Sequence, residues 1–274
     1  MLKISIPYYS DSSVYFDKIR HLDWPIFLDS SYQKNMAKNK LVRFDILTAN
    51  PFIKVILNAN NETTIHNLSN GTLQTVKENP VKILEDIMKD YKIPLSTLPF
   101  SGGALGYFSY DINNNQKKEN LIPGMQFGIY DWSVITDHHE KKSFIVSANF
   151  IKKTSEFIKS LSRQFLKEEV DLGNFSVKGE IEENITEKKY KSKFDKVKNF
   201  LKMGDCYQVN ISKKYKVRTY GDPWTFYHKF RQINQSPFMA YLKFDNTSLM
   251  SGSPERFLKS NSGKVSTRPI KGTS

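Results

Sequence analysis

The sequence has little of what several common classes of protein depend on. It contains a single cysteine, Cys206, so no internal disulfide can form, which favours a reducing compartment such as the cytoplasm. No stretch approaches the run of about 18 apolar residues that a membrane-spanning helix requires. The N-terminal residues also lack the apolar segment and cleavage site of a secretory signal. We therefore expect a cytoplasmic protein with no membrane association.

Familiar ligand-binding motifs are missing as well. Cysteine and histidine do not occur with zinc-site spacing, and there is no GxxxxGK[ST] phosphate loop. Gly102, Gly103 and Gly106 precede a predicted strand and not a helix, which argues against a dinucleotide-binding fingerprint. The pair His138-His139 lies in a predicted turn, where we expect surface side chains and not metal ligands.

Charge of one sign dominates the chain, with 41 lysines and arginines against 28 aspartates and glutamates, a formal net charge of +13. Only seven of the basic residues are arginine, the side chain best suited to bidentate recognition of phosphate. The lysines are spread along the chain. We interpret the charge as a solvated surface that can steer a small anionic substrate, and we do not expect a nucleic-acid partner.

Periodicity predicts an α+β fold in which antiparallel strands dominate. We divide the chain into an N-terminal domain (1–170), a polar, acidic linker (171–185) and a second domain (186–274). The predicted strands include 42–49, 53–59, 63–68, 72–77, 127–137, 143–150 and 206–217. Helices are predicted to begin at Pro80, behind an Asn79 cap, near Thr154, at Thr186 and after Asp222.

The C-terminal residues contain a candidate nucleophile. Lys271 lies between Pro269-Ile270 and a flexible Gly272, and Arg268 could lower its pKa or hold a carboxylate. A hairpin formed by residues 256–259 and 265–268 would bring Glu255 and Lys271 to the same end of the sheet. Such a pair could act as acid/base and nucleophile. An ordinary surface ion pair at a hairpin end is the alternative.

Six collinear stretches resemble the chorismate-utilising enzymes, most closely the branch that forms the large component of aminodeoxychorismate synthase. They run from residue 25 to the end of the chain. The stretches are Pro25–Ser30, Arg43–Ile46 with Ala49–Pro51, Ser101–Tyr107, Gly204–Asn210, Ser253–Phe257 and Thr267–Thr273. The resemblance implies antiparallel sheets packed as a sandwich with outer helices, as in the large component of anthranilate synthase. It also implies a second domain that is incomplete in these 274 residues.

The same resemblance implies a reaction and its residues. Lys271 would attack the chorismate ring and expel the 4-hydroxyl, and ammonia would then displace the lysine to give 4-amino-4-deoxychorismate. Glu255 would be the general acid/base, while Gly272, Thr273 and Gln208 would line the substrate pocket. Gln208 stands where water-adding members have a lysine base, and Lys271 stands where anthranilate synthases have a small residue.

Partners and cofactors follow from the resemblance too. It implies a glutaminase subunit that supplies ammonia, and Mg²⁺ whose ligands would lie beyond residue 274. A tryptophan site would fall on Ser30, Leu41, Val42, Arg43, Phe44, Pro237, Phe238 and Met239, for which core and turn packing is the alternative. For the function, an anthranilate synthase large component, or a non-catalytic remnant that binds tryptophan or the glutaminase, are the alternatives. We expect residues 1–274 to be inactive alone.

Overall fold

The computed structural model describes residues 1–33, 39, 41–93, 96–110, 112, 122–166 and 172–270. The chain forms two compact units, one of Met1–Asp171 with Tyr227–Ser274 and the other of Leu172–Phe226. This division differs from the predicted domains, because the strands after Tyr227 are hydrogen-bonded to strands near the N-terminus.

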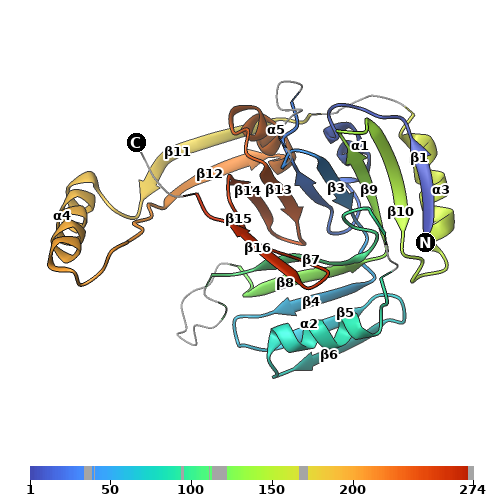
Figure 1. Cartoon of the computed structure of the whole chain (residues 1–274), viewed down its shortest axis with the longest axis horizontal. Coiled ribbons are helices and arrows are strands. Elements are labelled where there is room, and N and C mark those ends of the chain that lie inside the picture. The colour runs from blue at the N-terminus through green and yellow to red at the C-terminus, as the bar shows by residue number, and fades with distance from the viewer. Residues whose placement is uncertain are drawn as a thin grey trace. The chain divides into compact units, whose positions relative to one another are not determined.

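The first unit contains a seven-stranded sheet whose neighbouring strands are all antiparallel (Figure 1). Residues alternate between the two faces of each strand, and this alternation places one apolar set toward the core. In spatial order the strands are β1 (Leu2–Ile6), β10 (Lys142–Ser147), β9 (Trp132–Asp137), β3 (Phe44–Thr48), β2 (Ile26–Asp29), β13 (Phe238–Lys243) and β14 (Ser248–Ser253).

A five-stranded antiparallel sheet belongs to the same unit. In spatial order its strands are β6 (Thr72–Val76), β5 (Thr63–Asn67), β4 (Ile53–Leu57), β8 (Met125–Tyr130) and β7 (Gly103–Phe108). Helix α2 (Pro80–Lys89) covers one face of it by burying Ile83 among the side chains of β4, β5 and β8 (Figure 1). The helix begins as predicted, since Asn79 accepts hydrogen bonds from the N–H groups of Val81 and Lys82.

The two sheets pack face to face. Trp24, Ile26 and Leu242 from the larger sheet and its connections form one apolar cluster with Tyr130. Leu105 and Tyr107 of β7 pack against this cluster from the smaller sheet. The prediction of antiparallel sheets packed as a sandwich with outer helices is therefore confirmed.

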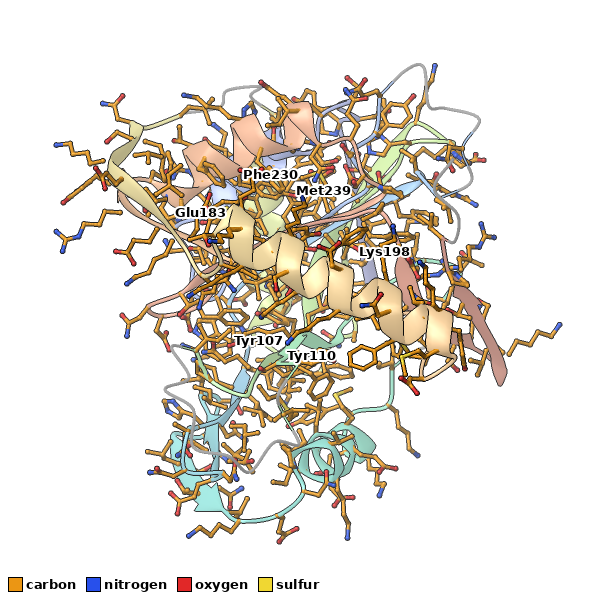
Figure 2. The ribbon with its side chains drawn as sticks, turned by 90° about the vertical axis from the view of Figure 1, so that its left-hand side faces the viewer. Tyr107, Tyr110, Glu183, Lys198, Phe230 and Met239 are labelled. Atoms are coloured by element: carbon orange, nitrogen blue, oxygen red, sulfur yellow. The ribbon has the colours of Figure 1, made fainter. Side chains whose placement is uncertain are left out.

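Helices cover the other face of the larger sheet. They are α1 (Ser13–Ile19), α3 (Thr154–Gln164) and, from Tyr227 onward, α5 (Pro223–Ile233). Phe16 of α1 stacks on Phe27 with ring centroids 5.5 Å apart, and Tyr227 lies 5.3 Å from Tyr241. Phe230 of α5 and Met239 of β13 also belong to this unit (Figure 2).

The second unit consists of a two-stranded sheet, β11 (Phe175–Glu183) with β12 (Tyr215–Gly221), and helix α4 (Glu187–Met203). Thr186 caps α4 and Gly204 ends it in the left-handed conformation at φ 78°. Figure 2 labels Glu183 at the end of β11 and Lys198 on α4. No α4 side chain is buried.

Three predicted elements differ from the structure. Most of the predicted linker 171–185 is strand, because β11 pairs with β12. The predicted strand 206–217 begins only at Tyr215, since residues 206–214 take part in no described ladder. The predicted strand 127–137 is two strands, β8 and β9, which belong to different sheets and are separated at the buried Asp131. Asp131 accepts hydrogen bonds from the N–H groups of Phe150 and Ile151.

Candidate functional site

A cavity of about 490 Å³ lies in the first unit, beside the ends of β2 and β13. Seven of the eight residues predicted to bind tryptophan line it, although they come from three separate parts of the chain. They are Ser30, Leu41, Arg43, Phe44, Pro237, Phe238 and Met239. The eighth, Val42, is buried and does not line the cavity. Antiparallel pairing of Asp29 with Met239 brings Ser30 close to Pro237, Phe238 and Met239.

One side of this cavity is cationic. Arg43 forms a bidentate ion pair with Asp137, with its Nη2 2.7 Å from Oδ2. Arg256 lies over the ring of Phe238, 5.8 Å from its centroid, and Lys259 follows on the same strand. The Nε of Arg256 is buried and has no hydrogen-bond partner among the described residues. The positive charges of Arg256 and Lys259 on this side suit an anionic ligand group such as a carboxylate.

Ser30, which lines the cavity, begins a buried chain of hydrogen bonds. Ser30 donates its N–H and its Oγ–H to Asp45 Oδ1, at 2.8 and 2.7 Å. The other oxygen of Asp45 lies 2.8 Å from His138 Nε2, and His138 Nδ1 lies 3.1 Å from the hydroxyl of Tyr8. Tyr32 stacks on the imidazole, with centroids 4.1 Å apart and ring planes 2° apart. The prediction that His138 is a surface residue is wrong, because β3 supplies a buried carboxylate to hold it.

Burial opposes ionisation of Asp45, yet the surrounding donors outweigh this effect. The hydrogen bond and charge interaction with His138, and the N–H of Ser30, lower the pKa of Asp45 to about 2. Burial raises the pKa of Tyr8 to about 12, with the nearby Tyr32 and Asp45 adding to the shift. Asp45 is therefore a carboxylate and Tyr8 a phenol at neutral pH.

A second buried carboxylate, Asp29, lies beside Ser30 and contributes to the same cavity. Arg231 of α5 donates to both of its oxygens, at 2.7 and 3.3 Å, and Tyr227 donates to Oδ2 at 3.2 Å. Burial raises the pKa of Asp29, and the charge of Arg231 only partly offsets this effect.

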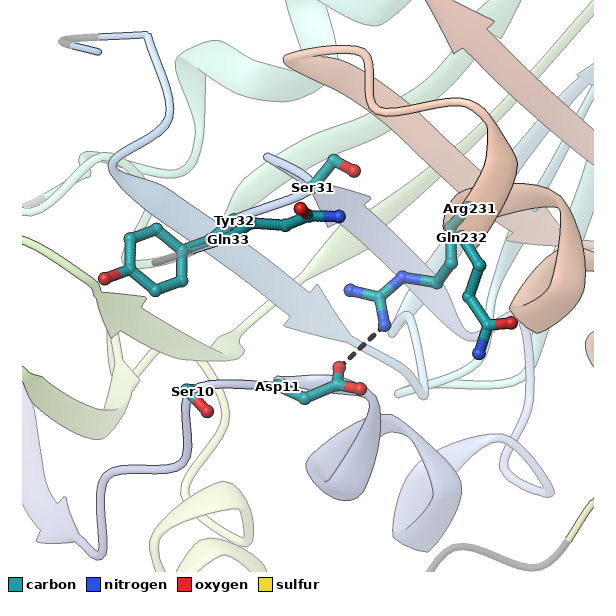
Figure 3. A pocket seen from close by; sticks show the side chains of 7 residues that line it. All are labelled: Ser10, Asp11, Ser31, Tyr32, Gln33, Arg231 and Gln232. Atoms are coloured by element: carbon teal, nitrogen blue, oxygen red, sulfur yellow. Dashed lines mark hydrogen bonds and ion pairs between the residues drawn. The ribbon is translucent and has the colours of Figure 1, made fainter. Parts of the chain in front are cut away.

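The far side of Arg231 faces a smaller, polar cavity of about 230 Å³ (Figure 3). There its Nη1 lies 2.7 Å from Asp11 Oδ1, the contact drawn as a dashed line in Figure 3. Ser31, Tyr32 and Gln33 form another wall of this cavity. Arg231 thus joins two cavities by holding one carboxylate in each.

The predicted catalytic residues are only partly described by the structure. Lys271, Gly272 and Thr273 lie outside the described residues. Gln208 is exposed and belongs to the second compact unit. Glu255 lies between β14 and β15 (Arg256–Asn261), where its N–H and C=O bond the hydroxyl of Ser253.

The predicted hairpin next to these residues is confirmed. β15 pairs with β16 (Lys264–Arg268), and Arg256 lies opposite Arg268. Glu255 therefore lies at the same end of the hairpin as Pro269.

Sequence reasoning missed Asp29, Asp45, His138 and Arg231. A signal for two of them was present in the pattern of the strands. Asp45 and Asp29 each occupy a buried position of a short, largely apolar strand, where an unpaired carboxylate would be costly. Such a position implies a buried cationic or hydrogen-bonding partner. The identity of that partner could not be read from the sequence, since His138 and Arg231 lie 93 and 202 residues away.

The described part of the chain has no helix that combines the length and apolar character needed to cross a membrane. Its histidine, cysteine and acidic side chains nowhere form a group of three or more suited to holding a metal ion.

Comparisons with known proteins give a consistent set of matches. Residues 31–274 match the family described as chorismate binding enzyme. Aminodeoxychorismate synthase component 1 of Escherichia coli is 32% identical over 94% of this chain and 56% of its own length. Anthranilate synthase component 1 of Acetivibrio thermocellus is 32% identical over 85% of this chain and 52% of its own. The chain thus spans about half the length of these relatives.

The fold has a solved counterpart. Anthranilate synthase component I from Streptococcus pneumoniae superimposes with a TM-score of 0.64 at 24% sequence identity. The superposition covers 81% of this chain and 53% of that one.

Proposed function

The chain belongs to the chorismate binding enzyme family, and on that premise we propose that it is part of an aminodeoxychorismate synthase component 1. The observation that carries the proposal is the 32% identity to the Escherichia coli enzyme over 94% of the chain. Lys271 stands where anthranilate synthases have a small residue, and Gln208 stands where water-adding members have a lysine base. As the resemblance implies, both residues support the aminodeoxychorismate synthase branch. A cytoplasmic location is part of the proposal and is supported by the single, free Cys206.

The proposed reaction is a substitution in two steps. The Nζ lone pair of Lys271 forms a bond to the ring carbon of chorismate as the bond to the 4-hydroxyl oxygen breaks. Glu255 protonates the leaving oxygen, so that water departs. Ammonia from a glutaminase subunit then forms the new C–N bond and displaces the lysine nitrogen, which takes its electron pair back. Each step replaces one single bond by another, which is the gain of covalent catalysis.

Magnesium would neutralise the substrate's carboxylate in this proposal. The described residues offer no cluster of side chains for the ion. As the resemblance implies, its ligands would belong to the part by which the relatives exceed this chain.

The product distinguishes this function from that of an anthranilate synthase, whose component 1 is almost equally similar in sequence. The complete protein should convert chorismate, ammonium and Mg²⁺ to 4-amino-4-deoxychorismate, resolved by chromatography. Fluorescent anthranilate as the main product would refute the proposal. Lys271→Ala should abolish both turnover and any mass increase of the protein on incubation with chorismate. Residues 1–274 alone, which span 56% of the length of the Escherichia coli enzyme, should show no turnover.

We also propose that the 490 Å³ cavity binds tryptophan or a closely similar aromatic amino acid. Its cationic side, which includes Arg256 and Lys259, suits a carboxylate. Phe44, Phe238 and Met239 provide an apolar surface for an aromatic ring. Isothermal titration with L-tryptophan tests the proposal, with Phe238→Ala as the variant and the exposed Phe108→Ala, on β7, as its control. Equal heats for tryptophan and buffer would refute it.

A further inference from the structure

The hydrogen-bond chain Tyr8–His138–Asp45–Ser30 has no part in the reaction proposed above, yet it ends at the wall of the cavity. The side chains of His138 and Asp45 are 0% and 1% exposed, so bulk water cannot replace either partner. A buried network of this kind is stable only when each donor meets an acceptor. The direction of each hydrogen bond can therefore be deduced.

Asp45 is ionised and can therefore only accept hydrogen bonds. Its Oδ2 must receive the proton of His138 Nε2, and its Oδ1 must receive the N–H and the hydroxyl hydrogen of Ser30. On the other side of the imidazole, Nδ1 lies within hydrogen-bond distance of the Tyr8 hydroxyl. The hydrogens that Ser30 and His138 share with Asp45 therefore all point toward Asp45.

This order of groups differs from that of a catalytic triad. In a triad the histidine lies between the serine and the acid, and it removes the proton of the serine. Here the carboxylate lies between Ser30 and His138, and a carboxylate whose pKa is about 2 is too weak a base to activate a hydroxyl. The chain therefore orients Ser30 without making it a nucleophile.

We propose that Asp45 and His138 are positioning residues that fix Ser30 as a pure hydrogen-bond acceptor toward the cavity. The single hydroxyl hydrogen of Ser30 is committed to Asp45, so only the lone pairs of Oγ remain for a ligand. The cavity then selects a ligand with a hydrogen-bond donor at this end, such as the ammonium group of an amino acid. This selection rests on the proposed binding of an amino acid in the cavity.

The first experiment measures selection by titration calorimetry of the complete protein. The probes are L-tryptophan and indole-3-propionate, which has the same ring and carboxylate but no ammonium group. The wild type should prefer tryptophan by about tenfold or more, the usual strength of a hydrogen bond to a charged group. Asp45→Asn should lose most of this preference, because the asparagine NH₂ can donate to Ser30 and release its hydroxyl hydrogen.

A double-mutant cycle tests whether Asp45 acts through Ser30. In the Ser30→Ala background, Asp45→Asn should cause no further loss of preference, while a loss of equal size in both backgrounds would overturn the proposal. His138→Gln keeps an N–H donor for Asp45 and should retain the preference better than His138→Leu. Asp86→Asn makes the same chemical change on the exposed surface of α2 and should alter nothing.

A measurement without ligand separates this inference from the tryptophan proposal. In ¹⁵N spectra of the free protein, His138 should carry its proton on Nε2, and Ser30→Ala should shift the His138 signals. If the wild type binds no tryptophan but the spectra show this pattern, the tryptophan proposal fails and the positioning of Ser30 stands. A neutral imidazole protonated on Nδ1 would overturn the positioning, whatever binds in the cavity.

Discussion

Replacing Arg231 by methionine should destabilise the protein strongly, because it leaves a buried carboxylate without its cation. Asp29 is 0% exposed at the side chain and receives hydrogen bonds from Nε and Nη2 of Arg231. Removing one partner of a buried ion pair costs about 3–5 kcal/mol. The second carboxylate on Arg231, Asp11, is 47% exposed, so its loss should add no more than about 1 kcal/mol.

The pH dependence of this loss identifies its cause. Burial already raises the pKa of Asp29, and Arg231 lowers it, so the variant should have a still higher pKa at this carboxyl. A folded-state pKa above the unfolded value means that the folded protein gains stability as the pH falls. The deficit of Arg231→Met relative to wild type should therefore shrink between neutral pH and about pH 5.

The assay is urea unfolding followed by tryptophan fluorescence at several pH values. Asp29→Asn/Arg231→Met removes both charges and should be more stable than Arg231→Met alone by about 2 kcal/mol at neutral pH. If the single and double variants lose equal stability, or if acid does not reduce the deficit, then lost packing and not an uncompensated charge is responsible.

Three further predictions concern stability, each measured as the free energy of unfolding in urea. Asn79→Ala removes the cap of α2 and should cost about 1 kcal/mol, whereas an unchanged value would mean that the cap is dispensable. Gly106→Ala would place its Cβ 1.9 Å from the carbonyl oxygen of Gln126 and should cost about 3 kcal/mol. Gly71→Ala, which meets no atom within 4 Å, should cost only about 1 kcal/mol for its left-handed backbone; equal losses would contradict the clash. Because the pKa of Asp45 is lowered to about 2, the ionised Asp45 should add to the free energy of unfolding above about pH 4. This added stability should disappear as the pH falls toward 2. Asp45→Asn should remove that part of the acid dependence.

Local signals predicted the parts of the fold that depend on neighbouring residues. Asn79 followed by Pro80 marks a helix start, because its side chain reaches N–H groups two and three residues away. The alternation in residues 42–76 predicts a meander, and from β4 to β6 each strand does pair with the next. Its first strand, β3, was predicted wrongly, because it pairs with β2 and β9 in the larger sheet. These elements depend little on the remainder of the chain.

The failures arise where distant residues decide the structure. Nothing between Phe127 and Asp137 indicates that the chain leaves one sheet for the other at Asp131, since that choice depends on β4 and β3 as partners. Similarly, the burial of His138 depends on Asp45, 93 residues earlier. The residues of the large cavity were predicted only through the resemblance to a family, because no local pattern connects Ser30 with Phe238.

The pairing of β2 with β13 has a consequence for how the chain is made. Asp29 lies opposite Met239, so a ribosome must add roughly 210 further residues before β2 acquires its second neighbour, a delay of about 10 to 40 s at common rates of synthesis. During that time β2 is an open strand edge, which is prone to pair with other chains. A nascent chain stalled before Phe238 should therefore require chaperones more than the finished one.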